Sequence, residues 1–259
     1  MATALITGAS NGIGLELARI HASKGDNLVL VARNISKLHQ IKTELEGKFK
    51  ISVHIIGKDL SLPNAPQEVY DELKQKNIAV NYLINNAGFG DYGFFTETNW
   101  EKELQMINLN ITALTHFTKL FLQDMVKRRS GKIMNVASIA AFISGPTMAI
   151  YYASKAYVLS FSEAIDNEVR DKGVTVTTLC PGPTETGFLE AAALQDSKLF
   201  KGKKIASAKE VAEYGYKAMM QGKTVAIHGF MNRVMANIVR FIPRALVVKA
   251  VRSIQAKIN

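Results

Sequence analysis

The chain is poor in the residues that hold small secreted or metal-binding domains together. Its 259 residues include one cysteine, six prolines and one tryptophan. A single cysteine excludes an internal disulfide and favours a reducing compartment, so we expect a cytoplasmic protein. The five histidines show no metal-ligand spacing, and we expect no metal site. We also expect no targeting signal, internal repeat or low-complexity segment.

Acidic residues are missing from the last 46 positions, which hold eight basic ones. The chain has 32 basic and 22 acidic residues, a net charge of +10, so the first 213 residues carry 24 − 22 = +2. The pattern predicts two amphipathic helices, one from Phe230 to Ile242 and one after Pro243. They could dock on the protein's own core, form a subunit interface, or lie peripherally on an anionic membrane. We expect no nucleic-acid partner.

Short β-rich runs alternate with longer helical patterns along the chain. This alternation predicts an α/β fold, in which one doubly wound parallel sheet of about seven strands is flanked by helices. Two long helices are expected over Asn110–Arg129 and Tyr151–Lys172. We expect one domain, with residues 1–229 as its catalytic part and 230–259 as a helical extension. The predicted strands are Ala2–Thr7, Asn27–Arg33, Ile51–Ile56, Val80–Asn85, Gly131–Ala137, Val174–Cys180 and Thr224–His228.

A glycine-rich turn, residues 8–14 (Gly-Ala-Ser-Asn-Gly-Ile-Gly), directly follows the first predicted strand. Glycines let the backbone turn sharply and approach a diphosphate, and a helix N-terminus points free N–H groups at the negative charge. The turn lacks the lysine of a nucleotide-triphosphate loop. Its position between a strand and a helix therefore predicts binding of a dinucleotide.

The second predicted strand ends in Ala32-Arg33, and no carboxylate is present there. In dinucleotide folds an acid at this place binds the ribose hydroxyls, whereas an arginine accommodates a 2′-phosphate. Arg33 follows Gly14 by 19 residues. This position predicts NADP(H) rather than NAD.

Ser138, Tyr151 and Lys155 form the strongest catalytic pattern. Tyr151 and Lys155 are four residues apart at a helix start and share one face, and Ser138 follows the fifth strand. An isolated tyrosine has a pKa of about 10, and a neighbouring ammonium is expected to lower it. Tyr151 then serves as general acid or base in carbonyl reduction or alcohol oxidation, while Ser138 holds the oxygen.

These motifs resemble the short-chain dehydrogenases/reductases, from Ala2 to about Gly187. The resemblance implies a Rossmann-type fold and an oxidoreductase. It is carried by Thr7 with the glycine turn, Asp59, Asn85-Asn86-Ala87-Gly88, Asn110, Ser138, Tyr151-Tyr152-Ala153-Ser154-Lys155 and Pro181-Gly182.

The resemblance also implies roles for individual residues. Asn110, with Asn108 as a rival, holds a water in the proton relay, and Lys155 also binds the nicotinamide ribose. Asp59 contacts adenine, and the turn after Pro181 lies near the carboxamide. With the glycine turn and Arg33, the predicted cofactor contacts are Gly8, Ser10, Asn11, Gly12, Ile13, Gly14, Arg33, Asp59, Leu60, Asn86, Ala87, Gly88, Tyr151, Lys155, Pro181, Gly182, Thr184 and Thr186.

The sequence indicates only that the substrate pocket is apolar, and it does not identify the substrate. Hydrophobic side chains follow three predicted strands, and they either line a pocket or pack under the loops. We expect a small carbonyl or alcohol substrate and a homodimer or homotetramer, as is usual in the family. The alternatives are a 3-oxoacyl-carrier-protein reductase and, from another class, a nonenzymatic NADP sensor. The side chains concerned are Phe89, Tyr92, Phe94, Phe95, Ile139, Phe142, Phe188, Leu189 and Leu194.

Overall fold

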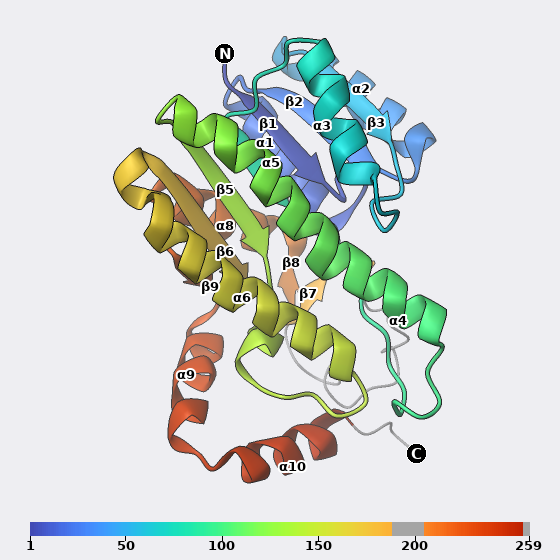
Figure 1. Ribbon diagram of the computed structural model, residues 1–259, viewed down its shortest axis with the longest axis vertical. Helices are drawn as coiled ribbons and strands as arrows, with labels where there is room; N and C mark the ends of the chain where they lie inside the picture. Colours follow the sequence, from blue (N-terminus) through green and yellow to red (C-terminus); the bar gives the residue numbers. More distant parts are fainter. Residues whose placement is uncertain (188–204, 256–259) are drawn as a thin grey trace.

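A seven-stranded parallel sheet organises the protein (Figure 1). The structure is a computed structural model that describes residues 1–187 and 205–255. The strand order is β3-β2-β1-β4-β5-β6-β9, which confirms the predicted doubly wound α/β fold. The strands are β1 (Thr3–Thr7), β2 (Asn27–Ala32), β3 (Val53–Gly57), β4 (Tyr82–Asn85), β5 (Gly131–Val136), β6 (Val174–Cys180) and β9 (Val225–Ile227).

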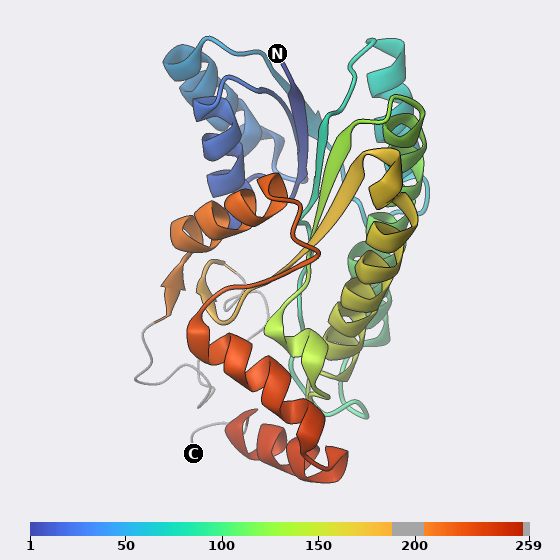
Figure 2. The ribbon, with the colours of Figure 1, turned by 90° about the vertical axis from the view of Figure 1, so that its left-hand side faces the viewer.

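Helices cover both faces of this sheet (Figure 2). One layer packs on the core of Leu17, Leu38 and Val211, and the other on that of Val69, Phe117 and Phe121. The first layer consists of α1 (Gly12–Ser23), α2 (Ile35–Phe49) and α8 (Ala208–Met220). The second consists of α3 (Ala65–Gln75), α5 (Leu114–Lys127) and α6 (Ala149–Val169).

The strand register aligns the chemically important strand ends. Thr7 in β1 lies opposite Val31 in β2, and Ile6 lies opposite Ile84 in β4. From β1 the chain adds β2 and β3 on one side, and from β4 it adds β5, β6 and β9 on the other, so the strand order reverses between β1 and β4. In open α/β sheets this switch point is where ligands bind. The glycine turn and the loop after Asn85 therefore meet at one place.

The helix predicted to begin at Asn110 begins earlier, which corrects the prediction. Helix α4 (Trp100–Ile107) is capped by Asn99, whose side chain accepts from the Lys102 N–H at 3.0 Å. It continues through a π-helix, Asn108–Ala113, directly into α5. Asn110 thus lies inside a helix, in a turn of the type that often marks functional sites. The helix predicted from Tyr151 starts at Ala149, and its 3-10 end (Arg170–Lys172) stops at the left-handed Gly173 as expected.

The C-terminal segment forms the two predicted amphipathic helices. Helix α9 (Phe230–Ile238) ends in a 3-10 turn, Val239–Phe241, and α10 (Arg244–Gln255) follows Pro243. Both views place this pair beyond the carboxyl ends of the strands, on the same side as the loop after β5 (Figures 1 and 2). A small parallel pair, β7 (Thr184–Glu185) and β8 (Ala206–Ser207), precedes α8.

Candidate active site

The glycine turn after β1 forms a cradle that side chains would fill. Gly8 and Gly12 have φ angles of +65° and +53°, in the left-handed region that favours glycine. A Cβ on Gly14 would lie 2.4 Å from the Gly8 carbonyl oxygen, so no other residue fits there without a shift. The lack of side chains at these three positions lets the turn pack closely on itself, on the loop after β4 and on Thr186.

The loop after β4 is tied to this turn. The Asn86 side chain donates to the carbonyls of Thr7 and Gly8, at 2.9 and 3.2 Å. The Thr7 hydroxyl in turn accepts from the N–H groups of Asn86 and Ala87, both at 3.0 Å. The predicted contacts at Asn86 and Ala87 therefore also fix the shape of the cradle.

The N-terminus of α1 is suited to a diphosphate. Its N-cap residue, Asn11, makes no capping hydrogen bond through its side chain to the described residues. A Cβ on Gly12 would lie 2.9 Å from the Thr186 side chain, so Thr186 stands directly over the turn. Free helix N–H groups and the absence of side chains at the glycines fit the phosphates of a dinucleotide. Ser10 and Ile13 lie in this same turn and helix start.

Arg33, Asp59 and Leu60 lie at the ends of β2 and β3. Arg33 is exposed, and its charge acts on the Asp59 carboxylate. Partial burial opposes ionisation of Asp59, but two hydrogen bonds from Ser61 and the Arg33 charge outweigh it and lower its pKa. Leu60 is buried in the core, so only its backbone is able to face a cofactor.

Ser138 and Tyr151 lie in hydrogen-bond contact. Ser138 follows β5 and begins a 3-10 turn, Ile139–Phe142, where its hydroxyl accepts from the Ala140 N–H at 3.1 Å. Tyr151 lies in the first turn of α6 and is partly buried. The strand end and the helix start thus bring the two hydroxyls together, as the sequence predicts.

Lys155 lies one turn after Tyr151 and is buried. Its ammonium donates to the Val136 carbonyl at 2.9 Å and lies 5.8 Å from the centre of the Tyr151 ring. Burial lowers the pKa of Lys155 to about 8. The expected lowering of the Tyr151 pKa is wrong for this structure: burial raises that pKa, and it outweighs the hydrogen bond from Ser138. Tyr151 therefore holds its proton firmly, which suits a general acid.

Asn110 holds the loop after β4 at the site. It is buried, and its amide donates to the Phe89 carbonyl and to Ser154, at 3.0 and 3.1 Å. Its side-chain oxygen accepts from the Phe89 N–H at 3.2 Å. A Cβ on Gly88 would lie 2.9 Å from that oxygen and 3.4 Å from the Lys155 ammonium. Asn110, which is more buried than Asn108, thus lies close to Lys155 across Gly88; its water-holding role stays a prediction.

The turn after β6 connects the site to the C-terminal helices. Pro181 accepts from the Ile139 N–H at 2.9 Å, and Thr184 is buried, donating to the Gly182 carbonyl at 2.9 Å. A Cβ on Gly182 would lie 2.4 Å from the Asn232 side chain in α9. Asn232 has no motif around it, and sequence reasoning did not find it.

Helix α10 packs on the apolar cluster that contains Tyr151, and we call it the roof of the site; the sequence analysis does not predict this contact. Val247 and Val251 pack with Tyr152 and Met148 in one apolar cluster. The Gln255 side chain is buried and donates to the Tyr152 hydroxyl at 2.6 Å, and the backbone carbonyl of Gln255 accepts from the Tyr92 hydroxyl at 2.9 Å. Tyr152 is therefore held in packing, which separates its role from that of Tyr151.

Removing the Gln255 side chain should destabilise the protein. Gln255→Ala leaves the buried Tyr152 hydroxyl without this partner, and such a loss costs about 1–3 kcal/mol. Chemical denaturation measures the change in the free energy of unfolding. In a double-mutant cycle, Tyr152→Phe should recover part of the loss, because the orphaned hydroxyl is then gone. Strictly additive losses would contradict the proposed contact.

The predicted pocket residues divide into two groups. Phe89, Tyr92, Ile139 and Phe142 are partly buried near the site. Phe94 and Phe95 are 52% and 62% exposed, so they do not pack under the loop. The residues predicted after the Pro-Gly turn, Phe188, Leu189 and Leu194, lie outside the described residues.

Comparisons with known proteins identify the family of the chain. A family model for short chain dehydrogenases matches residues 2–197. The chain is 36% identical over 183 residues to 17-beta-hydroxysteroid dehydrogenase type 3 of Mus musculus, covering 69% of this chain and 58% of that protein. It is 33% identical over 185 residues to the very-long-chain 3-oxoacyl-CoA reductase of Homo sapiens, with the same two coverages. The chain thus spans 58% of the length of each of these curated relatives.

A solved structure extends the likeness to the whole fold. The short-chain dehydrogenase from Sphingobium yanoikuyae in complex with NADPH has a TM-score of 0.81 and 27% sequence identity. The match covers 95% of this chain and 98% of that chain. The fold, the glycine cradle and the family model over residues 2–197 lead to one conclusion: the chain belongs to the short-chain dehydrogenase/reductase family of oxidoreductases, which use a nicotinamide cofactor.

Proposed function

We propose that this protein is an NADP(H)-dependent reductase of a ketone or aldehyde group on an apolar substrate. The observation that carries the proposal is the Ser138–Tyr151–Lys155 cluster next to the glycine cradle. A complete catalytic set argues against the alternative of a nonenzymatic sensor. The carbonyl or alcohol substrate and the cofactor are the partners that this chemistry requires.

The proposed chemistry assigns a task to each group. A bound nicotinamide dinucleotide supplies the hydride. Ser138 holds the substrate oxygen by a hydrogen bond, and Tyr151 gives its phenolic proton to that oxygen as it becomes an alcohol. Because burial raises the pKa of Tyr151, the proton is present at neutral pH. Lys155 holds the cofactor ribose and places a positive charge near the Tyr151 ring.

Arg33 should select NADPH over NADH. The guanidinium is exposed at the end of β2, in the position that accommodates a 2′-phosphate. Losing a charge-assisted contact costs about 1.5–3 kcal/mol, so Arg33→Ala should weaken NADPH binding about 10- to 100-fold. Binding of NADH should change much less. Fluorescence titration with both cofactors measures this, and equal losses would show that Arg33 does not recognise the phosphate.

The substrate class rests on the roof and on the relatives. Val247, Val251 and the ring of Tyr92 give the site apolar walls. Such walls favour an apolar substrate, and the two relatives carry the names of a hydroxysteroid dehydrogenase and a very-long-chain 3-oxoacyl-CoA reductase. Reduction of a 3-oxoacyl thioester is the second candidate, favoured by that second relative and by the basic C-terminal helices, because acyl carriers are acidic.

A substrate panel tests the proposal. Bulky ketones, aldehydes and 3-oxoacyl thioesters are mixed with the protein and NADPH, and loss of NADPH absorbance is followed. We expect oxidation of NADPH with at least one apolar carbonyl compound. Preference for the thioesters would favour the second candidate. Tight NADPH binding without turnover of any class would favour a sensor.

A further inference from the structure

The outer face of the C-terminal helices is strongly apolar. Of the 16 large hydrophobic side chains that are exposed in the described residues, eight lie between positions 230 and 254. Phe230, Met231 and Phe241 are 70%, 72% and 86% exposed. We call this surface the C-terminal face; its apolar residues are Phe230, Met231, Val234, Ile238, Phe241, Ile242, Leu246 and Ile254.

Docking on the protein's own core leaves this face uncovered. In α10, Val247, Val251 and Gln255 are four residues apart and form the side that packs on the active-site cluster. Leu246 and Ile254 lie on a neighbouring stripe and remain 57% and 46% exposed. In α9 only Ala236 is buried. Packing on the active-site cluster therefore accounts for the buried side of the two helices, and nothing in the described residues covers their exposed apolar side.

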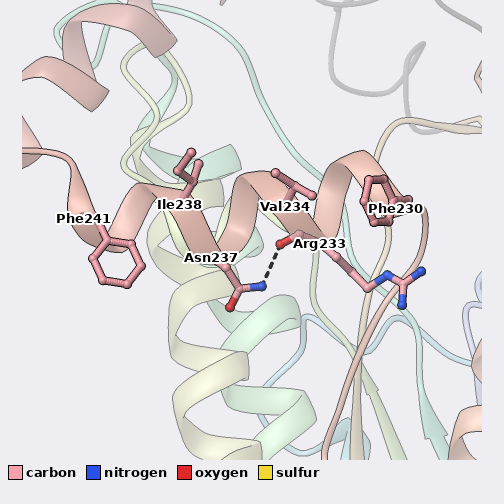
Figure 3. A pocket seen from close by; sticks show the side chains of 6 residues that line it. All are labelled: Phe230, Arg233, Val234, Asn237, Ile238 and Phe241. Carbon is pink, nitrogen blue, oxygen red and sulfur yellow. Dashed lines mark hydrogen bonds between the residues drawn. The ribbon is translucent and has the colours of Figure 1, made fainter.

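Apolar side chains from α9 and from the 3-10 turn after it lie together in one strip. Phe230, Val234 and Ile238 recur every four residues, and Phe241 extends the series (Figure 3). With Arg233 and Asn237 they line a shallow groove of about 450 Å³. Contiguous exposed apolar surface of this kind marks interaction sites.

Exposed basic side chains lie on the same C-terminal segment, and Arg233 lines the groove itself. Arg233, Arg240, Arg244, Lys249 and Arg252 are exposed, and none of them forms an ion pair with another described residue. The sequence from Tyr214 to the end contains no acidic residue. Self-association through this face would bring the same cations together across a two-fold axis, which disfavours a second copy. An anionic bilayer offers both an apolar interior and negative headgroups.

We propose that the C-terminal face binds the surface of an anionic membrane, with its aromatic residues in the acyl boundary and its cations among the headgroups. In the described residues no helix is long and apolar enough to cross a membrane, so the proposed contact is peripheral. It places the roof of the active site at the lipid surface, where apolar substrates concentrate.

Vesicle flotation tests the proposal with the full-length protein. Vesicles are made either of phosphatidylcholine alone or of phosphatidylcholine mixed with phosphatidylglycerol. We expect co-flotation with the mixed vesicles at low salt, and weaker binding as salt screens the charges. Each basic residue near such a surface contributes about fivefold to partitioning. Arg233→Ser/Arg240→Ser should therefore reduce binding about 20- to 30-fold.

Matched control variants distinguish binding through the C-terminal face from nonspecific adsorption to vesicles. Phe230→Ser/Phe241→Ser should lower partitioning by roughly tenfold or more for each ring, whereas Trp100→Ser should not, although Trp100 is 56% exposed elsewhere. Lys24→Ser/Lys76→Ser removes the same charge from other surfaces and should have little effect. NADPH binding confirms that each variant is folded.

Two outcomes would overturn the proposal. The first is absence of wild-type co-flotation with the mixed vesicles at low salt. The second is equal loss of binding in the face variants and their controls. A third result would identify a different partner. If the wild type does not bind vesicles, and the face variants are monomers in analytical ultracentrifugation where the wild type is a dimer, the C-terminal face binds a second copy of the chain and the membrane proposal is wrong.

Discussion

Tyr151→Phe should reduce kcat for carbonyl reduction by about 10²- to 10⁴-fold, the usual contribution of a general acid. The substitution removes the transferable proton and keeps the ring, so the packing around α6 is preserved. NADPH affinity should stay close to the wild-type value. Steady-state kinetics with the best substrate of the panel, together with a fluorescence titration of NADPH, measures both quantities.

The adjacent tyrosine provides the matched control. Tyr152→Phe also removes one hydroxyl, but that hydroxyl is held by Gln255 in the apolar cluster. We expect a loss of stability and near-normal turnover. If Tyr151→Phe kept wild-type turnover, or if Tyr152→Phe lost it instead, the assignment of the proton donor would be wrong.

Lys155→Ala should damage turnover and cofactor binding together. In the proposed function the ammonium holds the nicotinamide ribose, and loss of a charge-assisted contact weakens binding by about 10- to 100-fold. Turnover should fall further, because the positive charge near Tyr151 is also lost. Titration with NADPH and kinetics at saturating NADPH separate the two effects.

The pH profile gives an independent check of Lys155. Burial lowers its pKa to about 8, so the side chain is charged below that pH and neutral above it. The kcat/KM for NADPH reports ionisations of the free enzyme. It should be level below about pH 8 and decline as the pH rises through that value. Persistence of the same decline in Lys155→Ala would assign it to another group.

Local spacing predicts which residues the fold brings together at the centre of the candidate site. The glycine turn, Ser138 and the pair Tyr151–Lys155 each follow a strand or begin a helix, and parallel strands bring their ends to one edge. The glycine turn can also be identified from the sequence alone, because the positive φ angles of Gly8 and Gly12 are a property of the local backbone. The fold and these positions therefore follow from the sequence pattern.

Other features depend on packing that no local pattern shows. The direction of the Tyr151 pKa shift was predicted wrongly, because burial outweighs the neighbouring charge. The helix through Asn110 begins earlier than the apolar spacing predicts, because Asn99 caps it at Trp100 and a π-helix has no sequence signature. Gln255 and Tyr152 are 103 positions apart, so their contact exists only in the fold. The homodimer or homotetramer, the domain limits and the cytoplasmic location stay predictions.

Hydride transfer from NADPH is the central claim, and an isotope label tests it most directly. The cofactor is labelled with deuterium at both transferable positions of the nicotinamide, and the product of the best carbonyl substrate is analysed by mass spectrometry. We expect deuterium on the new carbinol carbon with the wild-type protein, and almost none formed by Tyr151→Phe in the same time. An unlabelled alcohol product, or NADPH binding with no product from any class of carbonyl compound, would contradict the account.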